Sequence, residues 1–84
     1  MVKMNKVINQ QGQEVVAAKK AKLHYEGSFC VVGDIVRPLY KFNVVGAPEK
    51  DTPLTVKLIW KEGNETILEF EETEFSAASK HFKF

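Results

Sequence analysis

Apolar and polar residues alternate with a period of two along much of the chain. The longest such run is 54–61, where leucine, valine, leucine and tryptophan occupy the even positions. This alternation predicts a strand whose even-numbered side chains face a core. A second apolar stretch follows at 66–70, after Glu62-Gly63-Asn64. Together the two stretches predict an antiparallel hairpin within 54–75.

The length of the hairpin loop decides which side chains face each other. A two-residue loop would place Leu58 opposite Glu69, so that charge meets an apolar group. A three-residue loop over 62–64 instead brings apolar residues together and sets lysine against glutamate. Asn64 suits the left-handed position that such a loop requires. The pairs expected from this loop are Lys61 with Glu65, Leu58 with Leu68, Lys57 with Glu69, and Val56 with Phe70.

Glycine and proline divide the rest of the chain into short pieces, which favours an all-β fold. Segment 14–20 contains the helix formers alanine and lysine, but its two valines favour a strand. Segment 46–53 carries two prolines and several charges and is expected to be an exposed loop. The other expected strands are 1–8, 20–26 with Ala21, Leu23 and Tyr25 on one face, 29–32, 35–36 after a turn at Gly33-Asp34, and 39–45 with Arg37-Pro38 at its start.

The C-terminal part allows two structures. Segment 73–80 is either a strand or one or two helical turns capped by Thr73 or Ser76. Segment 81–84 alternates and is either a short strand or an extended tail. The whole pattern predicts an all-β domain, a small antiparallel sandwich or partly open barrel of about 6–7 short strands, with at most one short C-terminal helix.

Length and composition narrow the class of protein. A chain of 84 residues is expected to form a single domain over 1–84, and 44% hydrophobic with 27% charged residues is ordinary for a globular chain. The longest apolar run, 29–32, is far below the roughly 20 residues that span a bilayer. The N-terminus shows no secretion signal and the chain has one cysteine. We therefore expect a cytoplasmic location and no membrane partner.

The net charge of +1 conceals an uneven distribution. Residues 1–42 hold seven lysines and arginines against three acids, whereas residues 43–84 hold five lysines against eight acids. Two faces of opposite sign would steer partners electrostatically. The alternative is that basic and acidic strands lie side by side in one sheet, where opposite charges attract.

The residues that carry catalytic or metal chemistry are few and scattered. His24 and His81 are far apart in sequence, and Cys30 lies in an apolar run where it is expected to be a small core residue. Glu69 and Glu71 share a strand face, but they are expected to pair with lysines. No phosphate-binding glycine motif is present. We therefore expect a protein that is not an enzyme and that has no cofactor and no metal.

Nucleic-acid binding is one alternative function. Aromatic residues interspersed with basic ones on a sheet bind single strands in oligonucleotide-binding barrels. Against this stand a pI of about 7.8 and the acidic second half of the chain. The residues expected to carry this function are Lys20, Lys22, Tyr25, Arg37, Tyr40 and Lys41.

Protein–protein contact is the function expected first, because a small open sheet offers strand edges to partners. Residues 80–84 are either an arm that docks onto another chain or an edge strand of the protein's own sheet. The expected partner-binding residues are Lys80, Phe82, Lys83 and Phe84. We thus expect a stand-alone adaptor or inhibitor of a larger protein. A self-assembling subunit, whose arm pairs copies into a homo-oligomer, is a further alternative.

Overall fold

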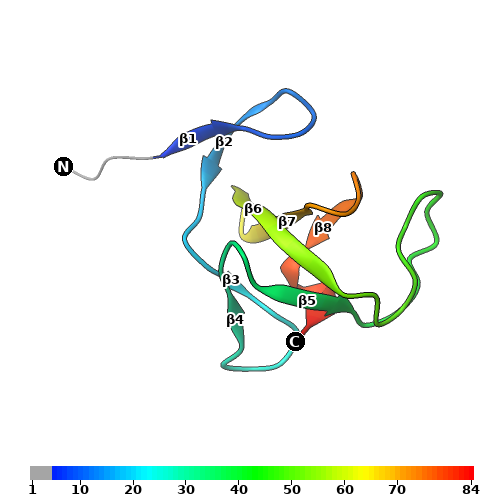
Figure 1. Ribbon diagram of the computed structural model, residues 1–84. Coiled ribbons are helices and arrows are strands. Elements are labelled where there is room, and N and C mark those ends of the chain that lie inside the picture. Colours follow the sequence, from blue (N-terminus) through cyan, green and yellow to red (C-terminus); the bar gives the residue numbers. More distant parts are fainter. Residues whose placement is uncertain (1–4) are drawn as a thin grey trace.

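The computed structural model describes residues 5–84 and consists of short antiparallel strands with a single turn of 3₁₀ helix (Figure 1). The all-β prediction is therefore confirmed, although the described residues form nine strand segments rather than six or seven. The strands are β1 (Lys6–Ile8), β2 (Glu14–Ala17), β3 (Ala21–Lys22), β4 (Phe29–Cys30), β5 (Ile35–Pro38), β6 (Leu54–Glu62), β7 (Glu65–Phe70), β8 (Ser76–Ala78) and β9 (Phe82–Lys83), and the 3₁₀ turn η1 is Ser79–His81.

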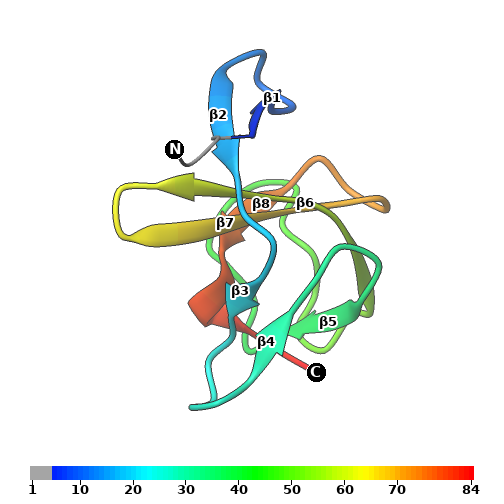
Figure 2. The ribbon, with the colours of Figure 1, turned by 90° about the vertical axis from the view of Figure 1, so that its left-hand side faces the viewer.

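Strand β6 organises the sheet, because it pairs with three other strands. Its C-terminal half pairs with β2 and its N-terminal end with β5, while β7 follows its other edge. The main path runs β1-β2-β6-β5-β9, β8 extends the sheet from β7, and β3 and β4 form a separate two-stranded sheet. The sheet does not close into a barrel. The β1–β2 hairpin projects from the rest of the molecule in both ribbon views (Figures 1 and 2).

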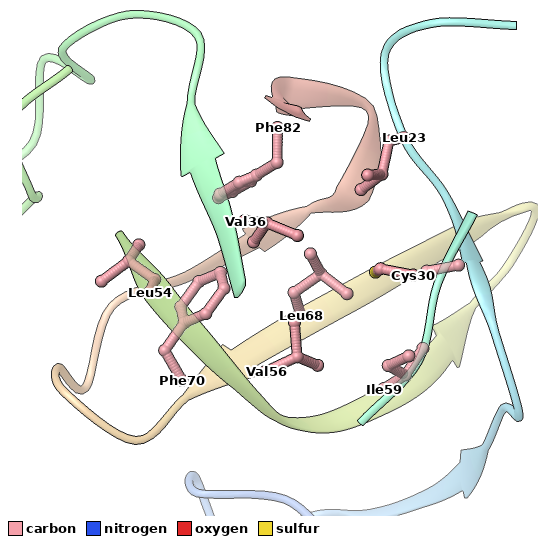
Figure 3. Close-up of a cluster of buried hydrophobic side chains, with 10 residues drawn as sticks. Leu23, Cys30, Val36, Leu54, Val56, Ile59, Leu68, Phe70 and Phe82 are labelled. Carbon is pink, nitrogen blue, oxygen red and sulfur yellow. The ribbon is translucent and has the colours of Figure 1, made fainter. Parts of the chain in front are cut away.

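The core is one cluster of buried side chains between β6–β7 and the strands β3, β4, β5 and β9 (Figure 3). The rings of Phe70 and Phe82 lie at its centre with centroids 5.1 Å apart. Each fully buried side chain of this kind stabilises the fold by about 1.5–3 kcal/mol relative to exposure. The members are Ala21, Leu23, Cys30, Val36, Leu54, Val56, Ile59, Leu68, Phe70 and Phe82.

The β6–β7 hairpin forms as expected, but the predicted three-residue loop is wrong. Glu62 pairs with Glu65 across a two-residue turn, and Leu58 faces Glu69. The left-handed residue is Gly63, with φ of 61°, and not Asn64. Glycine at the first central position is typical of a II′ turn, whose twist matches that of the strands.

A β-bulge at Lys57 explains how Val56 still pairs with Phe70 as expected. Lys57 is the additional residue, so the face that points to the core changes from even to odd positions beyond it. Ile59 is therefore fully buried in the core. Trp60 faces the opposite side and is covered there, with only 7% of its surface exposed.

The register is favourable because Glu69 has donors that the hairpin sequence does not reveal. Its Oε2 accepts hydrogen bonds from Trp60 Nε1 at 3.0 Å and from the backbone N of Gln10 at 3.1 Å. A buried carboxylate with hydrogen bonds is far less costly than an unpaired one. The expected pairing of Lys57 with Glu69 does not form, and Glu65 pairs with Lys80 instead of Lys61.

The expected strand over 39–45 is wrong. After Pro38 the pairing with the β9 segment extends by one hydrogen bond, from the Leu39 N–H to the His81 carbonyl at 3.0 Å. The chain then leaves the sheet, because Phe42 turns inward onto Phe75, with ring centroids 4.9 Å apart. Val45 at the end of the segment is fully exposed.

The ambiguous segments resolve mostly as strands. Within 14–20 the structure has β2, as expected, and within 73–80 it has β8 followed by the η1 turn rather than a regular helix. Tyr25 does not join Ala21 and Leu23 in the core, since it lies in the turn after β3 and is 55% exposed. The expected first strand over 1–8 is seen as β1, and its first four residues lie outside the described part of the chain.

Candidate partner-binding surface

Segment 80–84 is not a free arm, because Phe82–Lys83 form strand β9 of the protein's own sheet and Lys80 lies in the η1 turn. Phe82 is fully buried and pairs with Pro38, which corrects its assignment as a partner-binding residue. Lys83 Nζ lies 3.0 Å from Asp51 Oδ1, and Lys80 Nζ lies 3.3 Å from a carboxylate oxygen of Glu65. Of the four expected residues, Phe84 alone presents a large exposed apolar surface, at 57%.

Half of the expected nucleic-acid residues come together around the β3–β4 hairpin. Lys20 Nζ lies 4.5 Å from the centre of the Phe29 ring, a cation–π contact. Lys22 Nζ lies 3.0 Å from Glu26 Oε1 on the exposed surface. Tyr25 adds an exposed ring to this group.

The other half lies in β5 and just after it, and its basic groups have partners within the chain. Arg37 donates to the Asp51 carbonyl at 3.0 Å. Lys41 Nζ contacts Glu49 Oε2 at 2.6 Å. The Tyr40 hydroxyl is hydrogen-bonded to His81 Nδ1, and burial, then the nearby charge of Lys80, lowers the pKa of His81. These contacts reduce the positive charge that this segment offers to a phosphate backbone.

One exposed apolar surface was not assigned to binding from the sequence. It comprises the side chains around the turn between β4 and β5, which we call the apolar turn: Phe29, Val31, Val32 and Ile35. Their exposed fractions lie between 43% and 54%, while Cys30 between them is fully buried. The signal in the sequence was the apolar run 29–32 immediately before Gly33, which predicted a strand with Cys30 in the core.

Hydrogen bonds hold the apolar turn in one conformation. Asp34 closes it twice, because its backbone N donates to the Val31 carbonyl at 3.1 Å and its Oδ2 accepts from the Val31 N at 2.9 Å. Gly33, with φ of 99°, donates to the Val56 carbonyl, and Val56 donates back to the Asp34 carbonyl. The turn is thereby fixed to β6, in the interior of the sheet.

The Cys30 thiol, which lies between the exposed side chains in sequence, is fully buried. Burial, together with the charge of Asp34, raises the pKa of Cys30 to about 11, so the thiolate that reacts with electrophiles is scarce at neutral pH. Among residues 5–84 no group of three or more histidine, cysteine, aspartate or glutamate side chains is placed to hold a metal ion. Exposed valine and isoleucine side chains on a fixed turn can bury apolar surface of a partner.

A second surface feature is a cleft of about 310 Å³ between β3 and the start of η1. The hydroxyl of Ser79, itself buried, donates to the Lys22 carbonyl at 2.6 Å and is hydrogen-bonded to Thr66. His24 and Glu26, which lie in the turn after β3, line the same cleft. The serine hydroxyl is thus already engaged in joining β3 to β7.

Among the described residues no helix is long and apolar enough to cross a membrane. No protein-family model matches the chain, and no curated protein and no solved structure matches it significantly.

Proposed function

We propose that this chain is a non-catalytic protein-binding module that contacts its partner through the apolar turn. The observation that carries the proposal is the exposure of four large apolar side chains on a turn fixed by hydrogen bonds to the sheet. Contiguous exposed apolar surface on a small domain is typical of interaction sites. A rigid turn also loses little conformational entropy on binding, which favours affinity.

The surroundings of the apolar turn suit an adaptor or inhibitor that docks onto a larger protein. Val31, Val32 and Ile35 supply the apolar centre, and Lys20 over the Phe29 ring supplies a charged rim. Interfaces commonly have this arrangement of an apolar centre with a polar margin. Removing the apolar surface from water gives the main driving force, at about 25 cal/mol per Å².

Charge placed in the apolar turn tests the proposal. We expect Ile35→Lys to leave the fold intact, because the side chain is 54% exposed, and to reduce capture of the partner from an extract of the source cells at least tenfold. Ile8→Lys is the matched control, since Ile8 is 63% exposed on β1 and lies outside the apolar turn. Equal losses for the two variants, or no loss for Ile35→Lys, would rule out the apolar turn as the contact surface.

Measuring the mass of the purified protein separates binding of a different protein from self-assembly. A heterologous partner predicts a monomer of 9.5 kDa in isolation. A dimer that Ile35→Lys converts to a monomer would instead assign the apolar turn to contacts between copies, which is the self-assembling alternative.

Single-stranded nucleic acid is the second candidate ligand, and the observation that favours it is the β3–β4 hairpin. Exposed Tyr25 and Phe29 rings there lie next to Lys20 and Lys22, and base stacking beside basic groups is how single strands are held. Ile35→Lys distinguishes the two candidates, because added positive charge should strengthen binding to a mixed-sequence single strand while it abolishes protein contact. Absence of salt-dependent binding to the wild type would exclude this candidate.

A further inference from the structure

Strand β8 has a free edge within the described part of the chain. The Ile59 carbonyl of β6 accepts a hydrogen bond from the Ala18 N–H on the β2 side, at 2.9 Å. Because the backbone groups of Ile59 point away from β7, its cross-strand partner Leu68 directs its own N–H and C=O away from β6 and toward β8. Leu68 pairs with Ala77. Because backbone direction alternates along an antiparallel strand, the N–H and C=O groups of Ser76 and Ala78 point away from β7. Within residues 5–84 no hydrogen bond is made on that side by the backbone of Ser76 or by the N–H of Ala78, whereas the Ala78 carbonyl accepts the first hydrogen bond of η1, from the His81 N–H.

The side chain of Gln10 lies near the N-terminal end of this edge. Its Nε2 donates to the carbonyl of Glu74, two residues before Ser76. Glu74 lies at a bend outside β8, which begins at Ser76. The Gln10 carboxamide therefore marks where the open edge ends.

A groove of about 630 Å³ lies along the N-terminal end of this edge. One wall is Phe75 and Ser76, and the floor and far side come from the β1–β2 turn and the loop after Phe42. Val44 and Val45 line it and are 60% and 102% exposed, so apolar surface is open to an occupant. The groove shares no residue with the apolar turn.

The charge of the groove identifies the kind of chain that fits. Glu74 is its one charged lining residue, and within residues 5–84 no lysine or arginine lines it. Gln10 and Gln11 supply neutral amides. A phosphate backbone or an acidic peptide would find no cation there, whereas a lysine or arginine of a peptide would meet a carboxylate.

We propose that this groove binds an extended peptide of a partner protein, which adds as a strand to the β8 edge. The peptide backbone pairs with both backbone groups of Ser76 and with the N–H of Ala78, an apolar side chain lies against Val44 and Val45, and a basic side chain faces Glu74. Strand addition of this type takes affinity from main-chain hydrogen bonds and specificity from alternate side chains. It provides a second contact, separate from the one proposed for the apolar turn.

The test uses a short synthetic peptide in which valine alternates with lysine, added to the ¹⁵N-labelled protein. We expect slower hydrogen exchange at the amides of Ser76 and Ala78 and chemical-shift changes at Val45. Replacing the peptide lysines by glutamate should weaken binding, because the peptide would then face Glu74 with like charge. Two further peptides carry N-methyl groups, one on the backbone nitrogens of the valines and the other on those of the lysines. Because only alternate N–H groups of an added strand face β8, one of these peptides should bind about fivefold more weakly and the other should bind unchanged.

Val45→Lys should weaken binding of the lysine peptide, because it places a cation in the groove. The Val45 side chain is fully exposed, so this substitution should leave the stability of the fold unchanged. Val32→Lys is the matched control and should leave peptide binding unchanged while it disrupts the apolar turn. Even weak strand addition with a Kd of about 1 mM would be detectable at about 1 mM peptide. Unaltered hydrogen exchange at the Ser76 and Ala78 amides at that concentration would overturn the proposal. Equal binding of both methylated series, or a dimer of the protein that pairs β8 with β8, would also overturn it.

Discussion

Glu69 is a nearly buried carboxylate with no ion-pair partner among residues 5–84: it is 2% exposed, and it accepts hydrogen bonds there from the Trp60 indole and the Gln10 backbone. Those donors come from β6 and from the β1–β2 turn, so one side chain joins the projecting hairpin to the body. Removing the carboxylate leaves the indole N–H buried without an acceptor, which costs about 1–3 kcal/mol.

We therefore predict that Glu69→Ala lowers the free energy of unfolding by about 2 kcal/mol in urea titrations. Glu71→Ala is the control, because Glu71 is exposed and should change stability by less than about 0.5 kcal/mol. Similar losses for the two variants would mean that the hydrogen bonds of Glu69 contribute nothing measurable.

His81 gives the stability of the protein a dependence on pH. Burial first, and then the charge of Lys80, lowers its pKa in the folded chain below the ordinary value of 6.5, although Glu65 acts in the opposite direction. Between the two pKa values the unfolded chain binds more protons, so unfolding becomes easier as the pH falls below about 6.5. The loss levels off once His81 is charged in the folded state as well.

Urea midpoints measured from pH 8 to pH 5 should show this decrease in the wild type. His81→Gln should show a smaller decrease over the same range, because the variant has no imidazole to titrate there. A curve of unchanged slope in the variant would assign the pH dependence to other groups.

At the scale of elements, the II′ turn of the β6–β7 hairpin predicts opposite sensitivities for its two residues. Gly63 has φ of 61° and open space around its Cα, so Gly63→Ala suffers from backbone strain rather than from a clash. We expect it to destabilise the protein by about 1–2 kcal/mol. Asn64→Ala should have little effect, since Asn64 does not have a positive φ. Thermal unfolding of the two variants measures the difference, and a larger loss for Asn64→Ala would contradict the turn assignment.

The same hairpin shows how far sequence reasoning reaches. Alternation correctly identified β6 and the burial of Leu54 and Val56. It could not reveal the bulge at Lys57, because residues 58–60 are all apolar and suit either face of the strand. Nor could it show that Glu69 would find a donor in Gln10, 59 residues away, and without that donor the observed register appears unfavourable.

The candidate site was less predictable than the fold, for a related reason. The apolar run 29–32 predicts a strand with Cys30 in the core, and Cys30 is indeed buried there. Val31 and Val32 are exposed because the turn closed by Asp34 directs them outward, and this depends on the contact with Val56 in β6. Conversely, Phe82 reads as part of an arm, yet the pairing of β9 with β5 buries it.

At the scale of the whole molecule, both ends of the chain are tied to β6, one through β2 and the other through β5 and β9. The β9 end carries core packing: Phe82 stacks near Phe70 and Phe42, and its carbonyl accepts a hydrogen bond from the His24 N at 3.0 Å. Strand β9 thereby joins the β3 segment to the main sheet, so the last residues complete the domain.

This closure predicts a sharp contrast between two phenylalanines only two positions apart. Phe82→Ala should cost about 3–5 kcal/mol, because it opens a cavity at the centre of the core, and a domain of this size has little more than that to lose. Phe84→Ala should leave stability within about 0.5 kcal/mol, since its ring is 57% exposed. Circular dichroism with urea titration measures both. If Phe82→Ala folds with wild-type stability, β9 does not complete the core, and residues 80–84 act as the free arm that the sequence also allowed.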